Sequence, residues 1–164
     1  MRSILATGAL LAAITAPAPA MGDKPSYPTT SPTRPILVII ASSSTVDSLS
    51  LDDLARIFDG QTPELHPLNL PPGSRERIGF DQLVLGRSPD DIARYWIDRK
   101  IRGQGGPPRV IPNGRLLARI VARLPGTIGY TVDGPLPPGV KVLRIGGLSP
   151  DHPRYPLFIT EKPR

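Results

Sequence analysis

The apolar residues of this chain follow two patterns. Residues 36–40, ILVII, form a continuous aliphatic run, which is typical of a strand covered on both faces. Apolar residues at helical spacing predict four helices. Three of them begin after Ser50, Ser88 and Asn113, and the second helix of the chain covers residues 75–85. Further strands are predicted at 109–111, 127–132 and 140–145. Strands and helices mixed in this order predict an α/β domain with a mixed sheet flanked by about four helices.

The two ends of the chain differ in composition from this middle part. Arg2, the apolar residues 4–14 and the sequence Ala-Pro-Ala at 18–20 are typical of a secretory signal peptide over residues 1–20. Residues 21–35 are rich in Pro, Ser and Thr, which predicts a flexible leader. We therefore expect an exported, periplasmic protein with a folded domain at 36–146 and a C-terminal extension at 147–164. No apolar run approaches the roughly 20 residues of a membrane-spanning helix.

Charge and cysteine content restrict the class of protein and the kind of partner that we expect. The formal net charge is +6 and there is no cysteine, so a disulfide-stapled scaffold is excluded. The segment 99–123 holds seven basic residues and no acid, which predicts a positive region of the surface. An exported protein seldom meets nucleic acid, so small anions, acidic proteins or anionic lipid are the partners that we expect.

Several stretches resemble a known family. SLSLDDLARIFDGQTP, VLGRSPDDIARYW, GQGGPPR and PGTIGY are similar to segments of short phosphate-binding-protein-like periplasmic proteins, relatives of the substrate-binding component of phosphate ABC transporters. The similarity runs from about residue 36 to 145. It implies a type 2 periplasmic-binding-protein-like fold in which a ligand is held between two α/β lobes. This chain resembles chiefly the second lobe, so the resemblance implies a single lobe.

The resemblance also points to a ligand loop at the start of the second helix. Full-length members carry Ser-Gly-Thr there, and this chain has Ser74, Arg75 and Glu76. The serine is retained, whereas a glycine has become arginine and a threonine has become a carboxylate. The resemblance thus implies a ligand at this place but not the usual phosphate contacts.

The residues at this helix start include some that favour a bound anion and one that opposes it. Helix N-termini attract anions, and Arg75 and Arg77 are unfavourable there unless negative charge is near, whereas Glu76 opposes a ligand. Hydroxyl groups in the loop after the first strand are further candidates. The candidate ligand-binding residues are Gly73, Ser74, Arg75, Arg77, Ser43 and Ser44. The alternatives are a capped helix with a solvated first turn and an ordinary polar loop.

A stripe of arginines is predicted on the fourth helix. Arg115, Arg119 and Arg123 recur every four residues, so they share one helix face, and we call them the arginine stripe. The stripe is a candidate for docking to an acidic partner or to anionic lipid. The alternative is a solvated face in a basic protein.

Catalytic and metal-binding patterns are sparse. His66 and His152 each lie beside a proline in an expected loop, and neither belongs to a metal-ligand motif. No serine occupies a nucleophile elbow. We therefore expect no enzyme activity, no metal and no cofactor.

Two functions remain open at this point. The first is recognition of phosphate or another small oxyanion, as an accessory to ABC-type uptake through a permease or to sensing. The second is a ligand-free single-lobe interaction module for a membrane protein or sensor.

Export makes the first testable prediction. If residues 1–20 are a signal peptide, protein recovered from a periplasmic fraction will begin at Met21 or within a residue or two of it. N-terminal sequencing or intact mass measures this. Recovery of the chain with Met1 in the cytoplasmic fraction would contradict it.

Overall fold

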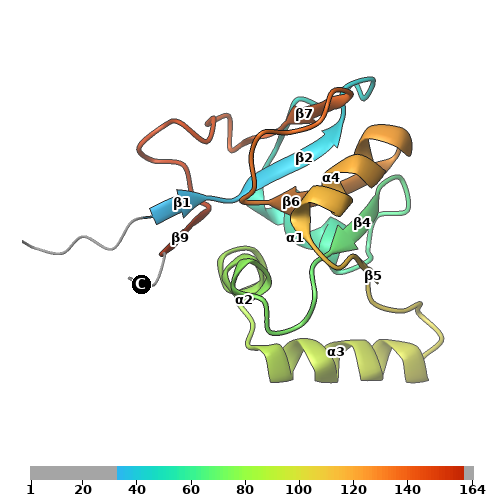
Figure 1. Cartoon of the computed structure of the whole chain (residues 1–164). Coiled ribbons are helices and arrows are strands. Elements are labelled where there is room, and N and C mark those ends of the chain that lie inside the picture. The colour runs from blue at the N-terminus through green and yellow to red at the C-terminus, as the bar shows by residue number, and fades with distance from the viewer. Residues whose placement is uncertain (1–32, 161–164) are drawn as a thin grey trace, which may run out of the picture. The chain divides into compact units, whose positions relative to one another are not determined.

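A five-stranded mixed sheet forms the centre of the structure, a computed structural model that describes residues 33–160 (Figure 1). The strand order is β5-β4-β6-β2-β7, with β6 antiparallel to β2 and parallel to β4. The predicted signal peptide and most of the predicted leader lie outside the described residues. The strands of this sheet are β2 (Leu37–Ala41), β4 (His66–Asn69), β5 (Arg109–Val110), β6 (Thr127–Thr131) and β7 (Val140–Val142).

The four predicted helices are present, each begun by a side-chain cap. Ser50, Ser74, Ser88 and Asn113 accept hydrogen bonds from the backbone N–H three residues later, which satisfies one of the free donors of each helix start. The second helix continues as a π-helical segment, η1 (Asp81–Leu85), that ends at Gly86 with a φ of 61°. The helices are α1 (Leu51–Phe58), α2 (Arg75–Phe80), α3 (Pro89–Ile101) and α4 (Gly114–Arg123).

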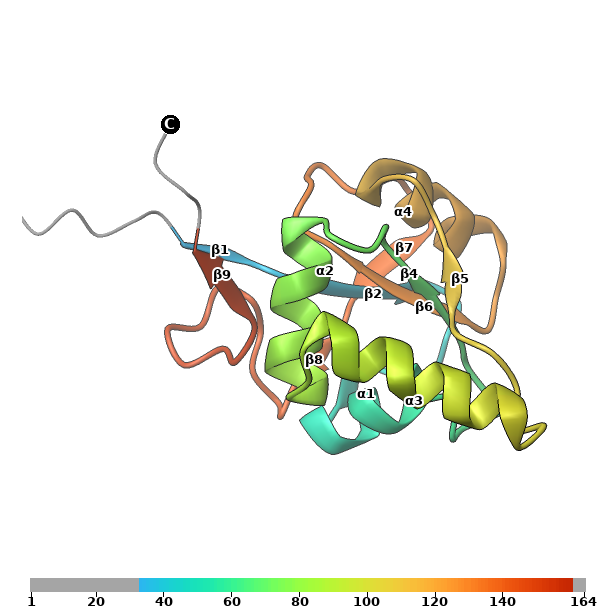
Figure 2. The ribbon, with the colours of Figure 1, turned by 90° about the horizontal axis from the view of Figure 1, so that it is seen from below.

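Helices cover both faces of the sheet, and neighbouring residues of β6 face them in turn. A Cβ added to Gly129 would lie 2.4 Å from Leu117 Cδ2, so α4 packs directly on the strand backbone. The next residue, Tyr130, stacks on Phe80 of α2 with ring centroids 3.9 Å apart. Because successive strand residues point to opposite faces, α4 and α2 lie on opposite sides of β6. Figure 2 shows α4 on one side of β6 and α1 and α3 on the other.

Two short sheets lie beside the central one. β1 (Thr33–Pro35) pairs with β9 (Phe158–Thr160), and β3 (Ser48–Leu49) pairs with β8 (Arg144–Ile145). Figure 1 shows β1 and β9 side by side at one end of the domain. Tyr155 and Leu157 are buried in the core. Strands β1 and β9 therefore lie outside residues 36–146, the predicted bounds of the folded domain.

Some sequence predictions of local structure were wrong. His66 begins strand β4 and is not in a loop, and the strand predicted at 140–145 divides into β7 and β8, which belong to different sheets. On the fourth helix, the apolar residues Leu116 and Leu124 are 39% and 53% exposed, so they lie outside the buried face of that helix. The first-strand prediction is confirmed with a shift of one residue, and Val38, Ile39 and Ile40 are fully buried.

The contact of α4 with β6 predicts a steric effect at Gly129. Gly129→Ala should lower the free energy of unfolding by about 1–3 kcal/mol, because the new methyl group overlaps Leu117. Gly106→Ala is the matched control, since no heavy atom lies within 4 Å of its added Cβ. Chemical denaturation of both variants measures the difference. Equal stability of the two variants would contradict the close contact of α4 with β6 at Gly129.

Candidate functional site

Two helices begin at one small cavity. The N-terminal ends of α2 and α4 flank a space of about 140 Å³, which we call the Ser74 cavity. Strand β6 and the segment that follows it contribute Thr131 and Asp133. The cavity is lined by Leu70, Pro71, Ser74, Glu76, Pro112, Asn113, Gly114, Thr131 and Asp133.

Local turns set both helix starts in place. The Ser74 N–H donates to the Pro71 carbonyl at 3.1 Å, across a turn in which Gly73 adopts a φ of 84°. Ser74 Oγ then accepts from the Arg77 N–H at 3.3 Å. On α4, Asn113 Oδ1 accepts from the Leu116 N–H at 2.9 Å. Both caps leave the N–H groups of the first helical residues without intrahelical partners.

The approach of α4 to the sheet depends on a glycine at its first position. An added Cβ at Gly114 would lie 2.2 Å from Thr131 Oγ1 and 3.0 Å from Asp133 Oδ2. Only a residue without a side chain fits there unless these neighbours move. The backbone of the helix start is therefore brought close to the Thr131 hydroxyl.

The electrostatics of the Ser74 cavity combine opposite tendencies. Each helix N-terminus carries roughly half a positive charge, which favours an anion. Helix α4 has no acidic residue in its first turn, in contrast to α1 and α3. Glu76 and Asp133, however, bring two carboxyl groups to the same cavity. The site therefore offers both hydrogen-bond donors and acceptors.

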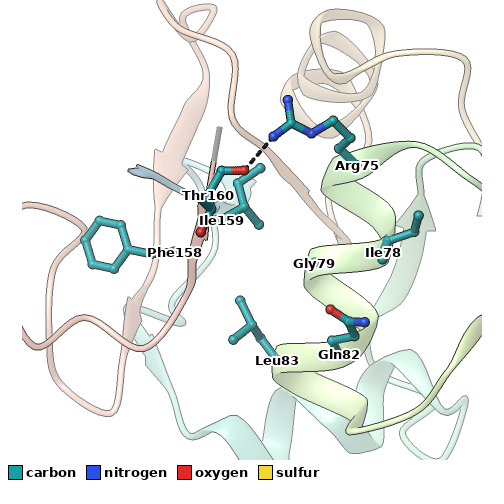
Figure 3. A pocket seen from close by; sticks show the side chains of 8 residues that line it. All are labelled: Arg75, Ile78, Gly79, Gln82, Leu83, Phe158, Ile159 and Thr160. Atoms are coloured by element: carbon teal, nitrogen blue, oxygen red, sulfur yellow. Dashed lines mark hydrogen bonds between the residues drawn. The ribbon is translucent and has the colours of Figure 1, made fainter. Parts of the chain in front are cut away.

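Arg75 points away from this cavity. Its Nη2 donates to the Thr160 carbonyl of β9 at 2.5 Å, across a different space between α2 and β9 (Figure 3). That space is lined mainly by apolar side chains, among them Leu83 and Phe158. The arginine thus ties α2 to the last strand.

Arg77 is buried, and the expectation of a solvated first turn is wrong for it. Its Nε pairs with Asp81 at 2.5 Å and its Nη1 donates to the Leu70 carbonyl at 3.2 Å. Burial raises the pKa of Asp81, and the guanidinium of Arg77 acts against that rise. Gly73 and Arg77 line a separate cavity against α3.

The predicted serines of the first loop lie at the other end of the sheet. Leu37 pairs with Thr131 across β2 and β6, and Ser43 follows six residues later, about 20 Å along the strand direction. Ser44 Oγ accepts from the Val46 N–H at 3.2 Å, within its own loop. The structure does not bring Ser43 and Ser44 to Ser74.

The arginine stripe is exposed on α4, as its spacing predicts. Arg115 and Arg119 also line a groove of about 400 Å³ between α4 and the loop at 133–137. The role of the stripe in binding a partner stays a prediction.

Sequence reasoning missed three residues of the Ser74 cavity as ligand candidates. The sequence pattern marks Asn113 only as a helix cap, and no motif includes Thr131 or Asp133. Nothing in their local sequence indicates a ligand site, because they come close to Ser74 only through the pairing of β4 with β6 and the packing of α4 on the sheet.

Two kinds of feature are missing from residues 33–160. Within this range no helix is long and apolar enough to cross a membrane. The described residues also hold no cluster of three or more His, Asp or Glu placed to bind a metal ion.

Solved structures with a similar fold include proteins that are described as components of phosphate transport. An ABC-type phosphate transport receptor from Vibrio cholerae matches with a TM-score of 0.63 and 15% identity, over 79% of this chain and 55% of that chain. A putative phosphate ABC transporter substrate-binding protein with bound phosphate, from Clostridium perfringens, matches with a TM-score of 0.63 and 15% identity, over 78% and 54%. PstS from Borrelia burgdorferi matches with a TM-score of 0.59 and 13% identity, over 78% of this chain and 55% of that chain. No family model and no curated protein matches the chain.

The chain has a periplasmic-binding-protein-like fold. It spans about half the length of the solved structures that it matches. These neighbours are binding proteins rather than enzymes. The expected fold class is therefore confirmed, and the resemblance to phosphate-binding proteins is supported at the level of the fold.

Because the arginines differ in burial, their removal should change the stability of the fold by different amounts. Replacing Arg115, Arg119 and Arg123 together by Gln should change the unfolding free energy by at most about 0.5 kcal/mol per site, because the side chains are exposed. Arg77→Gln should cost about 3 kcal/mol or more, because it leaves Asp81 buried without its partner. Thermal and denaturant unfolding measure both. A large loss in the triple variant would show that the stripe is structural.

Proposed function

We propose that this protein is an exported, periplasmic solute-binding-like protein that recognises hydrogen phosphate or a similar protonated oxyanion at the Ser74 cavity. The observation that carries the proposal is the convergence of two helix N-termini on one cavity. The fold neighbours support it, since one of them is described with bound phosphate. The partner that this function calls for is an ABC permease or a membrane sensor.

The helix starts would supply the hydrogen-bond donors. Free N–H groups at the first positions of α2 and α4 point out of the helix ends, where the macrodipoles favour negative charge. The hydroxyl groups of Ser74 and Thr131 add short polar groups to the same lining. An oxyanion accepts several hydrogen bonds at once, which matches this set of donors.

The two carboxyl groups restrict the kind of oxyanion. Glu76 and Asp133 repel an anion that offers only acceptors, whereas they accept a hydrogen bond from one that carries an O–H group. Hydrogen phosphate carries such a group at neutral pH and sulfate does not. The cavity should therefore prefer phosphate to sulfate.

The alternative is an interaction module that binds through α4. The observation in its favour is that the three arginines of the stripe are exposed together, beside the groove at residues 133–137. Such a surface suits an acidic segment of a membrane protein or sensor. This reading requires no ligand at Ser74.

Ligand-induced stabilisation tests the proposal. A ligand at a hundred times its dissociation constant should stabilise the fold by about 2.7 kcal/mol, so phosphate should raise the melting temperature and sulfate should raise it less. Scanning calorimetry of the whole protein with each salt at matched ionic strength measures this. If neither salt produces a shift, the oxyanion proposal fails and the interaction module takes its place.

Substitution of the cavity carboxylate tests the selectivity. Glu76→Gln removes a repelling charge, so sulfate should bind about tenfold more tightly, a change of about 1.4 kcal/mol. Arg75→Gln is the control, because this neighbouring side chain is engaged with Thr160 outside the cavity. Calorimetric titration of both variants gives the affinities. Unchanged sulfate affinity in the Glu76→Gln variant would show that the Glu76 carboxylate does not act on the ligand.

A further inference from the structure

A second cavity lies between α3 and α2, away from the Ser74 cavity. Its volume is about 240 Å³, and we call it the Trp96 cavity. Side chains of α3, of the turn before α2 and of the loop after α3 form its walls. Trp96 and Ile92 are the buried members from α3. Four prolines supply much of the remaining wall: Pro72, Pro89, Pro107 and Pro108.

The polar part of this cavity is a buried ion pair. The side chains of Arg77 and Asp81 are 10% and 6% exposed and pair with each other. Asp81 Oδ2 accepts from Arg77 Nε, whereas Asp81 Oδ1 is buried and has no hydrogen-bond partner among the described residues. A buried acceptor without a partner costs about 1–3 kcal/mol, so a donor that reached it would be favoured.

We propose that the Trp96 cavity binds a small, uncharged and mainly apolar molecule that carries one hydrogen-bond donor. The apolar walls favour a compact hydrocarbon body, whose transfer from water is favourable. Arg77 and Asp81 neutralise each other, so the site gives no net attraction to a charged ligand that would have to lose its hydration. The unpartnered Oδ1 atom of Asp81 can accept a hydrogen bond, so it favours a ligand that carries a donor over one that carries only an acceptor.

The size of the cavity limits the ligand to about one ring. Sites for drug-sized molecules usually span about 300–1,000 Å³, and this cavity is smaller. The Trp96 cavity shares no lining residue with the Ser74 cavity. The inference therefore holds or fails independently of the proposed oxyanion function.

The chain supplies its own reporter for this site. Trp96 is the single tryptophan of the sequence, so the spectrum of the nitrogen-labelled protein contains one indole N–H signal. We would titrate the whole protein with cyclohexanol, which has one O–H donor, and with cyclohexanone, which has nearly the same shape and only accepts. Cyclohexanol should shift the indole signal saturably and bind about tenfold more tightly than cyclohexanone.

A matched pair of variants ties the binding to the cavity. Ala93 is an exposed residue of α3 that lines the cavity, so Ala93→Phe should fill its mouth and abolish the cyclohexanol shift without burying the new ring in the core. Lys100→Phe places the same ring at an exposed position of α3 outside the lining and should bind as the unmodified protein does.

Three results would overturn the inference. One is the lack of any saturable shift with cyclohexanol, and another is equal affinity for the alcohol and the ketone. The third is unchanged binding in Ala93→Phe, which would place the alcohol elsewhere on the protein.

Discussion

Strand β6 is the element on which both the core and the Ser74 cavity depend. All five of its residues are buried, and its neighbouring positions Gly129 and Tyr130 hold helices on opposite faces. The missing side chain at Gly129 lets α4 approach, and the Tyr130 ring fixes α2 through Phe80. The Tyr130 hydroxyl donates to Asn69 of β4, and burial raises the pKa of this tyrosine. The two helix starts meet because one strand positions both helices.

The arginines of α2 have partners within the fold, so their presence at the helix start does not require a bound anion. In sequence, two arginines in the first turn of a helix suggest that negative charge lies nearby. In the structure, Arg77 forms an ion pair with Asp81, one turn later in the helix. Arg75 donates a hydrogen bond to a carbonyl oxygen of β9. The support for an oxyanion therefore comes from the helix ends and not from these side chains.

The sequence predicted the elements with strong local signals and missed those made by pairing over long distances. The four helices follow from their caps and apolar spacing, and Ser74 follows from a motif at one of those caps. β4 carries Pro67 and has little aliphatic character, so its place between β5 and β6 is set by tertiary pairing. Asp133 and Thr131 come to Ser74 across more than fifty residues of chain for the same reason, and no local pattern records that contact.

The segment from Leu70 to Arg77 separates the two cavities, and its residues divide between them. Leu70, Pro71, Ser74 and Glu76 line the Ser74 cavity, while Pro72, Gly73 and Arg77 line the Trp96 cavity. Ser74 and Arg77 are joined by the capping hydrogen bond, and Arg77 also holds the Leu70 carbonyl. A substitution at Gly73 or Arg77 therefore acts directly on the cavity beside α3 and reaches the Ser74 cavity only through the backbone of this segment. For that reason a loss of anion binding in an Arg77 variant would report on the position of the helix start, whereas a change at Glu76 would report on the charge that a ligand meets.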